Sequence, residues 1–153
     1  MTTIALVGAG GKMGCRLTDN FLNCPQYKLA CLEVSEQGIT HLKSRNIVPA
    51  IEKDVIPQAD VVILAVPDIS IGKISSFIIP SMKPGALVMT LDPAAPLAGV
   101  IHHRDDLGYV IAHPCHPSVF NWEPLADASR DFHVGLTAHH SIVVAFLLGT
   151  DAP

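Results

Sequence analysis

A cluster of glycines follows the first apolar run of the chain and constrains the fold more than any other feature. Residues 3–7 are apolar or β-branched, which is typical of a buried parallel strand, and they lead into Gly8-Ala9-Gly10-Gly11-Lys12-Met13-Gly14. Apolar residues at helical spacing follow over 10–23. Gly8 and Gly10 permit a tight turn and let backbone N–H groups approach an anion at the positive end of the helix. The order of strand, glycine turn and helix therefore predicts a pyrophosphate site.

The spacing of these glycines departs from the common GxGxxG pattern. Three residues separate Gly10 from Gly14, whereas Gly8, Gly11 and Gly14 fit GxxGxxG, a variant found in several nicotinamide-dependent enzymes. Gly14 is expected to let the helix pack closely on the strand. Lys12 is expected either beside the pyrophosphate or on an exposed helix face. Glycines alone are also compatible with a plain turn, so the next strand has to decide between these interpretations.

A carboxylate follows the second predicted strand at the position expected in a dinucleotide site. Glu33 lies at the carboxyl end of the strand at 28–34, 19 residues after Gly14. About 20 residues are typical for the acid that binds the adenosine ribose hydroxyls. Such a carboxylate repels a 2′-phosphate, and no arginine follows at once, which favours NAD over NADP. The alternative is a solvated strand end. We predict an NAD site with contacts from Gly8, Gly10, Gly11, Lys12, Met13, Gly14 and Glu33.

The remaining elements alternate between strands and helices. This pattern predicts an α/β domain with a doubly wound, mostly parallel sheet of the Rossmann type. Ser35 is expected to cap the helix at 36–44. At 153 residues the chain has the length of one domain, so the predicted dinucleotide-binding unit covers residues 1–153. Further strands are expected at 47–50, 61–66, 86–91, 109–112, 133–138 and 141–148, a helical turn before Gln58 and a helix at 69–82.

The composition excludes several classes of protein. The apolar share is 49% and the charged share is 16%, below the usual ~25%, so the chain is not disordered. Ten Lys and Arg against fourteen Asp and Glu argue against a nucleic-acid partner. No apolar run approaches the ~18 residues of a membrane span. The four cysteines form no CxxC pair, which favours reduced thiols in a cytoplasmic protein. So few charges predict a surface covered by a further domain or subunit.

Two later strands end in residues suited to a ligand site. Ligands of doubly wound sheets bind beyond the carboxyl ends of the strands. The strand at 61–66 ends in Val66-Pro67-Asp68, and Asp92 follows the strand at 86–91. We expect Val66 and Pro67 to line the cofactor groove with Asp68 at its rim, although Asp68 is equally suited to cap the next helix. Asp92 is expected either to face the ligand or to begin an Asx-turn before proline.

Seven of the eight histidines lie beyond residue 100, and one loop among them stands out. In Ala112-His113-Pro114-Cys115-His116-Pro117, each histidine precedes a proline, which favours extended geometry at the end of a predicted strand. A histidine there can act as a general base on a substrate hydroxyl or ligate a metal. His113 and His116 are therefore candidate catalytic residues, and His113 is a candidate metal ligand. The alternative is a rigid proline loop. Zinc held by this loop alone is disfavoured, because a fourth ligand is missing.

Together these motifs resemble those of bacterial D-apionate oxidoisomerases, within the 6-phosphogluconate dehydrogenase-like superfamily. The resemblance rests on residues 4–17, 32–36, 60–68 and 112–117, and it covers almost the whole chain. The glycine and Val-Pro-Asp motifs are shared across the superfamily, prephenate dehydrogenases included. The His-Pro-Cys-His-Pro loop is the more specific element.

The resemblance implies an enzyme that uses NAD to oxidise the branched sugar acid D-apionate while rearranging it to 3-oxo-isoapionate. It implies NAD contacts from residues 10–13, Glu33 and Asp68, and it places His113 toward the substrate. A divalent metal that polarises neighbouring oxygens is chemically sensible for such a rearrangement. Family members continue into a helical second domain that forms a homodimer and closes the active site, and this domain is absent from the 153 residues.

Two other functions fit the same motifs. One is a prephenate-dehydrogenase-like or β-hydroxyacid-dehydrogenase-like enzyme. The other is an NAD-binding sensor module without chemistry. A dehydrogenase reduces NAD when it is given the right acid, whereas a sensor binds NAD without turnover.

Overall fold

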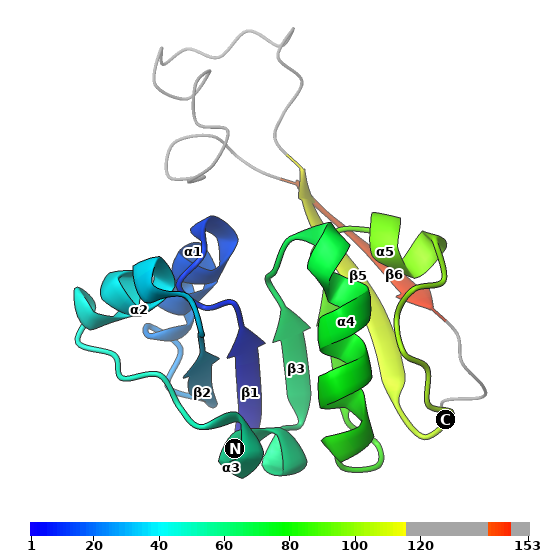
Figure 1. The fold of residues 1–153 in the computed structure, drawn as a ribbon, viewed down its shortest axis with the longest axis horizontal. Coiled ribbons are helices and arrows are strands. Elements are labelled where there is room, and N and C mark those ends of the chain that lie inside the picture. The colour runs from blue at the N-terminus through cyan, green and yellow to red at the C-terminus, as the bar shows by residue number, and fades with distance from the viewer. Residues whose placement is uncertain (116–140, 148–153) are drawn as a thin grey trace, which may run out of the picture.

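The structure, a computed structural model, describes residues 1–115 and 141–147 and contains the predicted α/β architecture (Figure 1). Within these residues a six-stranded sheet has the order β2-β1-β3-β4-β5-β6. The strands are β1 (Thr2–Val7), β2 (Tyr27–Leu32), β3 (Val61–Leu64), β4 (Leu87–Thr90), β5 (Gly108–Cys115) and β6 (Ser141–Leu147). The helices are α1 (Lys12–Phe21), α2 (Glu36–Lys43), α3 (Glu52–Val55), α4 (Asp68–Ile78) and α5 (Ala94–Leu97), with 3-10 helices η1 (Ile56–Gln58) and η2 (Ile79–Ser81).

The direction of strand addition reverses at β1. This strand pairs in parallel with β2 on one side, Val7 opposite Leu32, and with β3 on the other, Val7 opposite Leu64. The chain runs from β1 out to β2, then crosses back to β3 and continues through β4 and β5. At such a switch point the connections diverge and leave a crevice beyond the carboxyl ends of the strands. The topology therefore puts the most favourable ligand position above β1 and β3.

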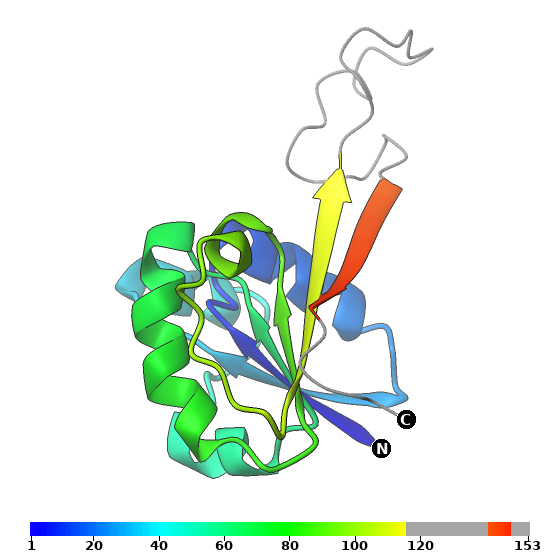
Figure 2. The same ribbon diagram turned by 90° about the vertical axis from the view of Figure 1, so that its right-hand side faces the viewer.

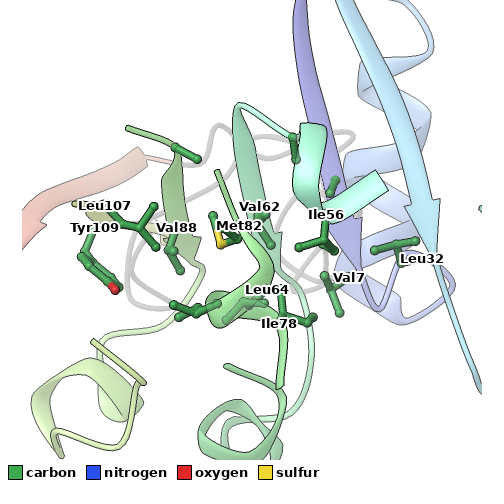
Figure 3. Close-up of a cluster of buried hydrophobic side chains, with 14 of the residues drawn as sticks. Val7, Leu32, Ile56, Val62, Leu64, Ile78, Met82, Val88, Leu107 and Tyr109 are labelled. Atoms are coloured by element: carbon green, nitrogen blue, oxygen red, sulfur yellow. The ribbon is translucent and has the colours of Figure 1, made fainter. Parts of the chain in front are cut away.

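Helices cover both faces of the sheet (Figure 2). Successive residues of a strand point to opposite faces, so Ala5 and Val7 join one apolar cluster while Ile4 and Leu6 join the other. The first cluster packs under α4 and is shown in Figure 3. The second packs under α1 and α2. Burial on both faces explains why the sequence of β1 is continuously apolar.

The predicted strand at 47–50 is wrong, because this segment connects α2 to α3 without joining the sheet. Its tie to β2 is a single hydrogen bond from the Ala50 N–H to the Cys31 carbonyl, 2.8 Å. Pro49 has no N–H to donate to a ladder, and Asn46 has a left-handed φ of 59° that turns the chain just before the segment. Val48 is 85% exposed. The apolar residues of this segment thus belong to the connection between α2 and α3 and not to a strand.

Helix α4 ends earlier than predicted. It stops at Ile78 and not at residue 82, because Pro80 lacks an N–H and the chain continues as η2. The predicted cap of α2 is confirmed, since the Ser35 hydroxyl accepts a hydrogen bond from the Gly38 N–H, 3.1 Å. No helix in the described part of the chain is long and apolar enough to cross a lipid bilayer.

The last strand runs against the others. β6 pairs antiparallel with β5, from Tyr109 opposite Leu147 to Cys115 opposite Ser141, and the two strands project beyond the rest of the sheet (Figure 2). This confirms a strand over most of 141–148, whereas the strand predicted at 133–138 lies outside the described residues. Part of the chain's high apolar share lies on the surface here, at Ile142, Val143, Val144 and Phe146.

A contact that requires an ionised carboxylate lies at the amino ends of β1 and β3. Asp60 accepts hydrogen bonds from the Thr3 N–H, 2.6 Å, and from the Lys83 ammonium, 2.5 Å. The Lys83 bond first, and then the Thr3 bond, lower the pKa of the Asp60 carboxyl. The folded-state pKa lies below the unfolded one, so this carboxylate stabilises the fold above the unfolded pKa and loses that effect as the pH falls through the folded pKa.

We therefore expect Asp60→Asn to lose less stability than the wild type between about pH 5 and pH 3. Urea unfolding at both pH values measures the difference. Asp54→Asn is the control, because the Asp54 carboxylate makes no hydrogen bond among the described residues. Parallel pH profiles for wild type and Asp60→Asn would show that the contact does not contribute.

Candidate functional site

The glycine turn after β1 has the tight geometry that the sequence predicted. Gly8 has a φ of +78°, and a Cβ on it would lie 2.5 Å from the Ala65 carbonyl oxygen, so only glycine fits. The N–H groups of Gly8 and Ala9 both donate to the Leu32 carbonyl, at 2.9 and 3.2 Å. A Cβ on Gly14 would lie 2.0 Å from the Gly8 oxygen. Gly14 thus brings α1 directly against the end of β1, as expected.

Gly10 has a different environment from the one predicted. Its N–H donates to Glu33 Oε2 at 2.9 Å. A Cβ on it would lie 2.2 Å from the carbonyl oxygen of Gly38 in α2. The absence of a side chain at Gly10 therefore admits helix α2, and its N–H is already occupied by a protein carboxylate. The sequence pattern gave no sign of this contact, because Gly10 and Gly38 are far apart along the chain.

The start of α1 offers the backbone N–H groups that an anion requires. Gly11 is the N-cap residue, with an extended backbone and no side-chain capping bond. Its own N–H donates to the Gly8 carbonyl, 3.1 Å. Lys12 and Met13 follow in the first turn, and all three residues line a cavity. The first N–H groups of a helix have no intrahelical partner and carry the positive end of its dipole. This helix end is thus suited to a phosphate group.

Glu33 follows β2 and is held in place by four hydrogen bonds. Oε1 accepts from the N–H groups of Val34 and Ser35, both at 2.9 Å, and from the Ser35 hydroxyl at 3.0 Å, while Oε2 accepts from Gly10. Burial alone raises the pKa of this carboxyl, but the bonds from Ser35, Gly10 and Val34 outweigh it and lower the pKa. Glu33 is therefore an oriented carboxylate whose Oε2 has one protein donor.

Two cavities meet at the carboxyl ends of β1 and β3, and Val66 lines both. The β2-side cavity, of about 520 Å³, extends from the glycine turn toward α4. The β4-side cavity, of about 430 Å³, lies on the other side of the turn. The β2-side cavity is lined by Gly8, Leu32, Glu33, Val34, Ala50, Ser70, Lys73, Ile74 and Phe77 among others. The β4-side cavity is lined by Gly11, Lys12, Met13, Val66, Pro67, Asp68, Leu91, Asp92 and His113 among others.

Several lining residues were not singled out from the sequence. Ser70, Lys73, Ile74 and Phe77 lie on one face of α4 and form a wall of the β2-side cavity. Their spacing of three and four residues is the sequence signal that indicates a shared helix face. The 67% exposure of Phe77 is revealed only by the structure. Ala50, expected in a strand, also lines this cavity.

The Val66-Pro67-Asp68 motif lies where the sequence placed it, beyond the end of β3. All three residues line the β4-side cavity. Pro67 is the N-cap of α4 and Asp68 its first residue, without a side-chain capping bond. The alternative that Asp68 caps this helix is therefore wrong.

His113 and Asp92 come together at the far wall of the β4-side cavity. His113 Nδ1 lies 2.8 Å from the Leu91 carbonyl and 3.6 Å from Asp92 Oδ2. A carbonyl oxygen only accepts, so Nδ1 donates its hydrogen and the neutral ring has an unprotonated Nε2. Asp92 also begins the predicted Asx-turn, because Oδ1 accepts from the Ala94 N–H at 2.8 Å. Both side chains are accessible, at 40% for His113 and 37% for Asp92.

The described residues do not assemble a metal site. No group of three or more His, Cys, Asp or Glu side chains close enough to share an ion occurs within residues 1–115 and 141–147. His116, the second histidine of the proline loop, lies outside the described residues, as do His133, His139 and His140. His103 pairs with Asp105 at 3.0 Å and stacks on Tyr109.

Comparison with known proteins supports the resemblance noted in the motifs. A D-apionate oxidoisomerase from Cupriavidus necator is 48% identical over 149 residues, which are 97% of this chain and 54% of that protein. One from Rhizobium rhizogenes is 44% identical over 99% of this chain and 55% of its own length. The chain is homologous to D-apionate oxidoisomerases. It spans about half the length of these curated relatives. No protein-family model matches it.

A solved structure shares the fold closely. It is a semialdehyde dehydrogenase NAD-binding protein from Cupriavidus necator in complex with calcium and NAD. It superimposes with a TM-score of 0.87 at 47% identity, and the match covers 99% of this chain and 55% of that one. The Rossmann-type fold class is thereby confirmed.

Proposed function

We propose that this chain is the NAD-binding part of an oxidoreductase that acts on the branched sugar acid D-apionate. The observation that carries the proposal is a pair of cavities that share Val66 as a lining residue, with Glu33 in one and both His113 and the uncapped start of α1 in the other. A dinucleotide needs two compartments joined at a phosphate site. The homologous D-apionate oxidoisomerases and the related NAD complex support the same conclusion.

The residues present fit NAD, and each half of the dinucleotide has its own compartment. The β2-side cavity would hold the adenosine half, with the Glu33 carboxylate toward the ribose hydroxyls. The N–H groups at Lys12 and Met13 would hold the pyrophosphate. The β4-side cavity would hold the nicotinamide half between Val66, Pro67 and Asp68. Gly8 and Gly14 have no side chains, and their part in the site is to permit this tight turn.

Bound NAD supplies the hydride acceptor. His113 supplies the base, because its Nε2 lone pair is free to accept the proton of a substrate hydroxyl while Nδ1 is held by the Leu91 carbonyl. The imidazolium that results is stabilised by the Asp92 carboxylate, 3.6 Å from Nδ1. A hydroxyl carbon that loses hydride and proton becomes a carbonyl. The described residues alone do not fit a divalent metal, so no step is assigned to one.

The remaining expectations from the sequence and from the resemblance stay predictions. They are the homodimer, the helical second domain, a catalytic role for His116 and a metal at His113. A sensor without chemistry is separated from an enzyme by one measurement, the formation of NADH from NAD and D-apionate by the complete protein.

Glu33→Gln tests the cofactor assignment. We expect NAD affinity to fall about 10- to 100-fold, since a hydrogen bond to a charged group contributes about 1.5–3 kcal/mol. NADP affinity is expected to fall less, because the repulsion of a 2′-phosphate is lost as well. Calorimetric titration with both dinucleotides gives their ratio, which general damage to the fold would not change. Glu36→Gln, in the exposed first turn of α2, is the control. An unchanged NAD to NADP ratio would remove Glu33 from the ribose site.

A further inference from the structure

Both polar groups of Gly10 are bound by residues of the segment that follows β2. The N–H of Gly10 donates to Glu33 Oε2 at 2.9 Å. Its carbonyl oxygen lies 2.8 Å from His41 Nδ1, in helix α2. Because a carbonyl only accepts, His41 Nδ1 is the donor. Glu33 and His41 therefore hold the same glycine from two sides.

The packing of α2 fixes the same point. Gly10 is buried, and a Cβ on it would lie 2.4 Å from the Cα of Gly38. In turn, a Cβ on Gly38 would lie 2.4 Å from the carboxyl carbon of Glu33. The two glycines let α2 approach closely enough for His41, one turn after Gly38, to reach the Gly10 carbonyl. The hydrogen bond between His41 and Gly10 thus depends on the close packing of α2 against the glycine turn.

The peptide unit between Gly10 and Gly11 is held at both ends. Its oxygen accepts from His41 at 2.8 Å and, more weakly, from the Cys15 thiol of α1 at 3.4 Å, and its N–H donates to the Gly8 carbonyl at 3.1 Å. The next N–H groups along the chain belong to Lys12 and Met13, at the uncapped start of α1. The orientation of this peptide therefore sets the direction in which α1 begins. His41 lines neither cavity, so it acts on the turn from outside.

We propose that His41 is a positioning residue of the dinucleotide site, which fixes the Gly10–Gly11 peptide and thereby aims the first N–H groups of α1 at the pyrophosphate. This rests on the proposed NAD site. It goes beyond it in assigning a role to an exposed side chain on α2 that lines neither cavity. It also links the two recognition elements, since the clamp on Gly10 is completed by Glu33.

The test compares ligands with and without a pyrophosphate on the 153-residue chain. We expect His41→Ala to weaken NAD and ADP by about 2- to 10-fold, the net effect of one hydrogen bond, and to leave adenosine affinity unchanged. His41→Asn is expected to restore NAD and ADP affinity, because its amide nitrogen can replace Nδ1 as donor. Lys43→Ala, on the same helix and exposed, is the control and should match the wild type. Ligand-observed NMR titration covers the weak binding of adenosine.

The outcomes separate the two proposals. Wild-type affinities in His41→Ala, or an equal loss for adenosine and NAD, would overturn the positioning role. Failure of His41→Asn to recover ADP binding while the melting temperature is unchanged would also overturn it. If the wild-type chain binds neither NAD nor ADP, the proposed NAD site itself is wrong.

Discussion

Gly14→Ala is expected to destabilise the domain by about 3 kcal/mol or more, the upper range for overpacking a tight contact. The added Cβ would lie 2.0 Å from the Gly8 carbonyl oxygen and 2.7 Å from the Ala9 backbone. These are backbone atoms, so no side-chain rotation relieves the clash. Helix α1 would have to move away from β1, and with it the N–H groups at Lys12 and Met13. Urea unfolding measures the stability and calorimetry the NAD affinity.

Gly11→Ala is the matched comparison for this result. Its Cβ would lie 3.3 Å from the same Gly8 oxygen, which requires a shift of a few tenths of an ångström only. We expect a stability change of about 1 kcal/mol or less, since the turn can relax at this exposed N-cap. Equal stability of the two variants would show that α1 can retreat from β1 without cost.

His113→Asn is expected to lower the turnover of D-apionate by about 10²- to 10⁴-fold, the usual contribution of a general base. The asparagine amide can still donate to the Leu91 carbonyl where Nδ1 does at 2.8 Å. It has no counterpart of the unprotonated Nε2, so the local structure is kept while the base is removed. Turnover is followed as NADH absorbance with the complete protein.

The affinity for NAD in the same variant completes this test. We expect it to stay within about threefold, because the residues assigned to the pyrophosphate and to the adenosine ribose are unchanged in this variant. His103→Asn, in the polar turn beside Asp105, controls for the loss of a histidine elsewhere. Full turnover in His113→Asn would mean that the imidazole is structural and that another residue takes the proton. NAD binding without turnover by the wild type would favour the sensor function.

Much of the site could be read from the chain because its signals are local. The glycine turn connects one strand to the next helix, and Gly8 and Gly14 act within seven residues of each other. Glu33 was found through its spacing from the turn, because β2 follows β1 at a regular distance in this fold. Even so, the hydrogen bond that Glu33 accepts from Gly10 was not predictable, since it joins residues 23 positions apart.

The segment at 47–50 shows where a local pattern misleads. Its apolar residues have strand character, but Pro49 cannot donate to a ladder and the position beside β2 is not filled by a paired strand. Ala50 instead lines the β2-side cavity. Propensity describes what a segment can adopt, whereas the sheet order decides which segments have a partner.

The sequence by itself determined most of the element order, the turn glycines, the acidic residue after β2 and the histidine near the carboxyl end of β5, because each depends on short spacing or on residue type. Only the tertiary structure decided that Gly10 receives α2, that His41 binds its carbonyl and that the Leu91 carbonyl selects the His113 tautomer. These contacts join residues 22 to 31 positions apart. They depend on how the strands are ordered in the sheet, and no periodicity along the chain encodes that order.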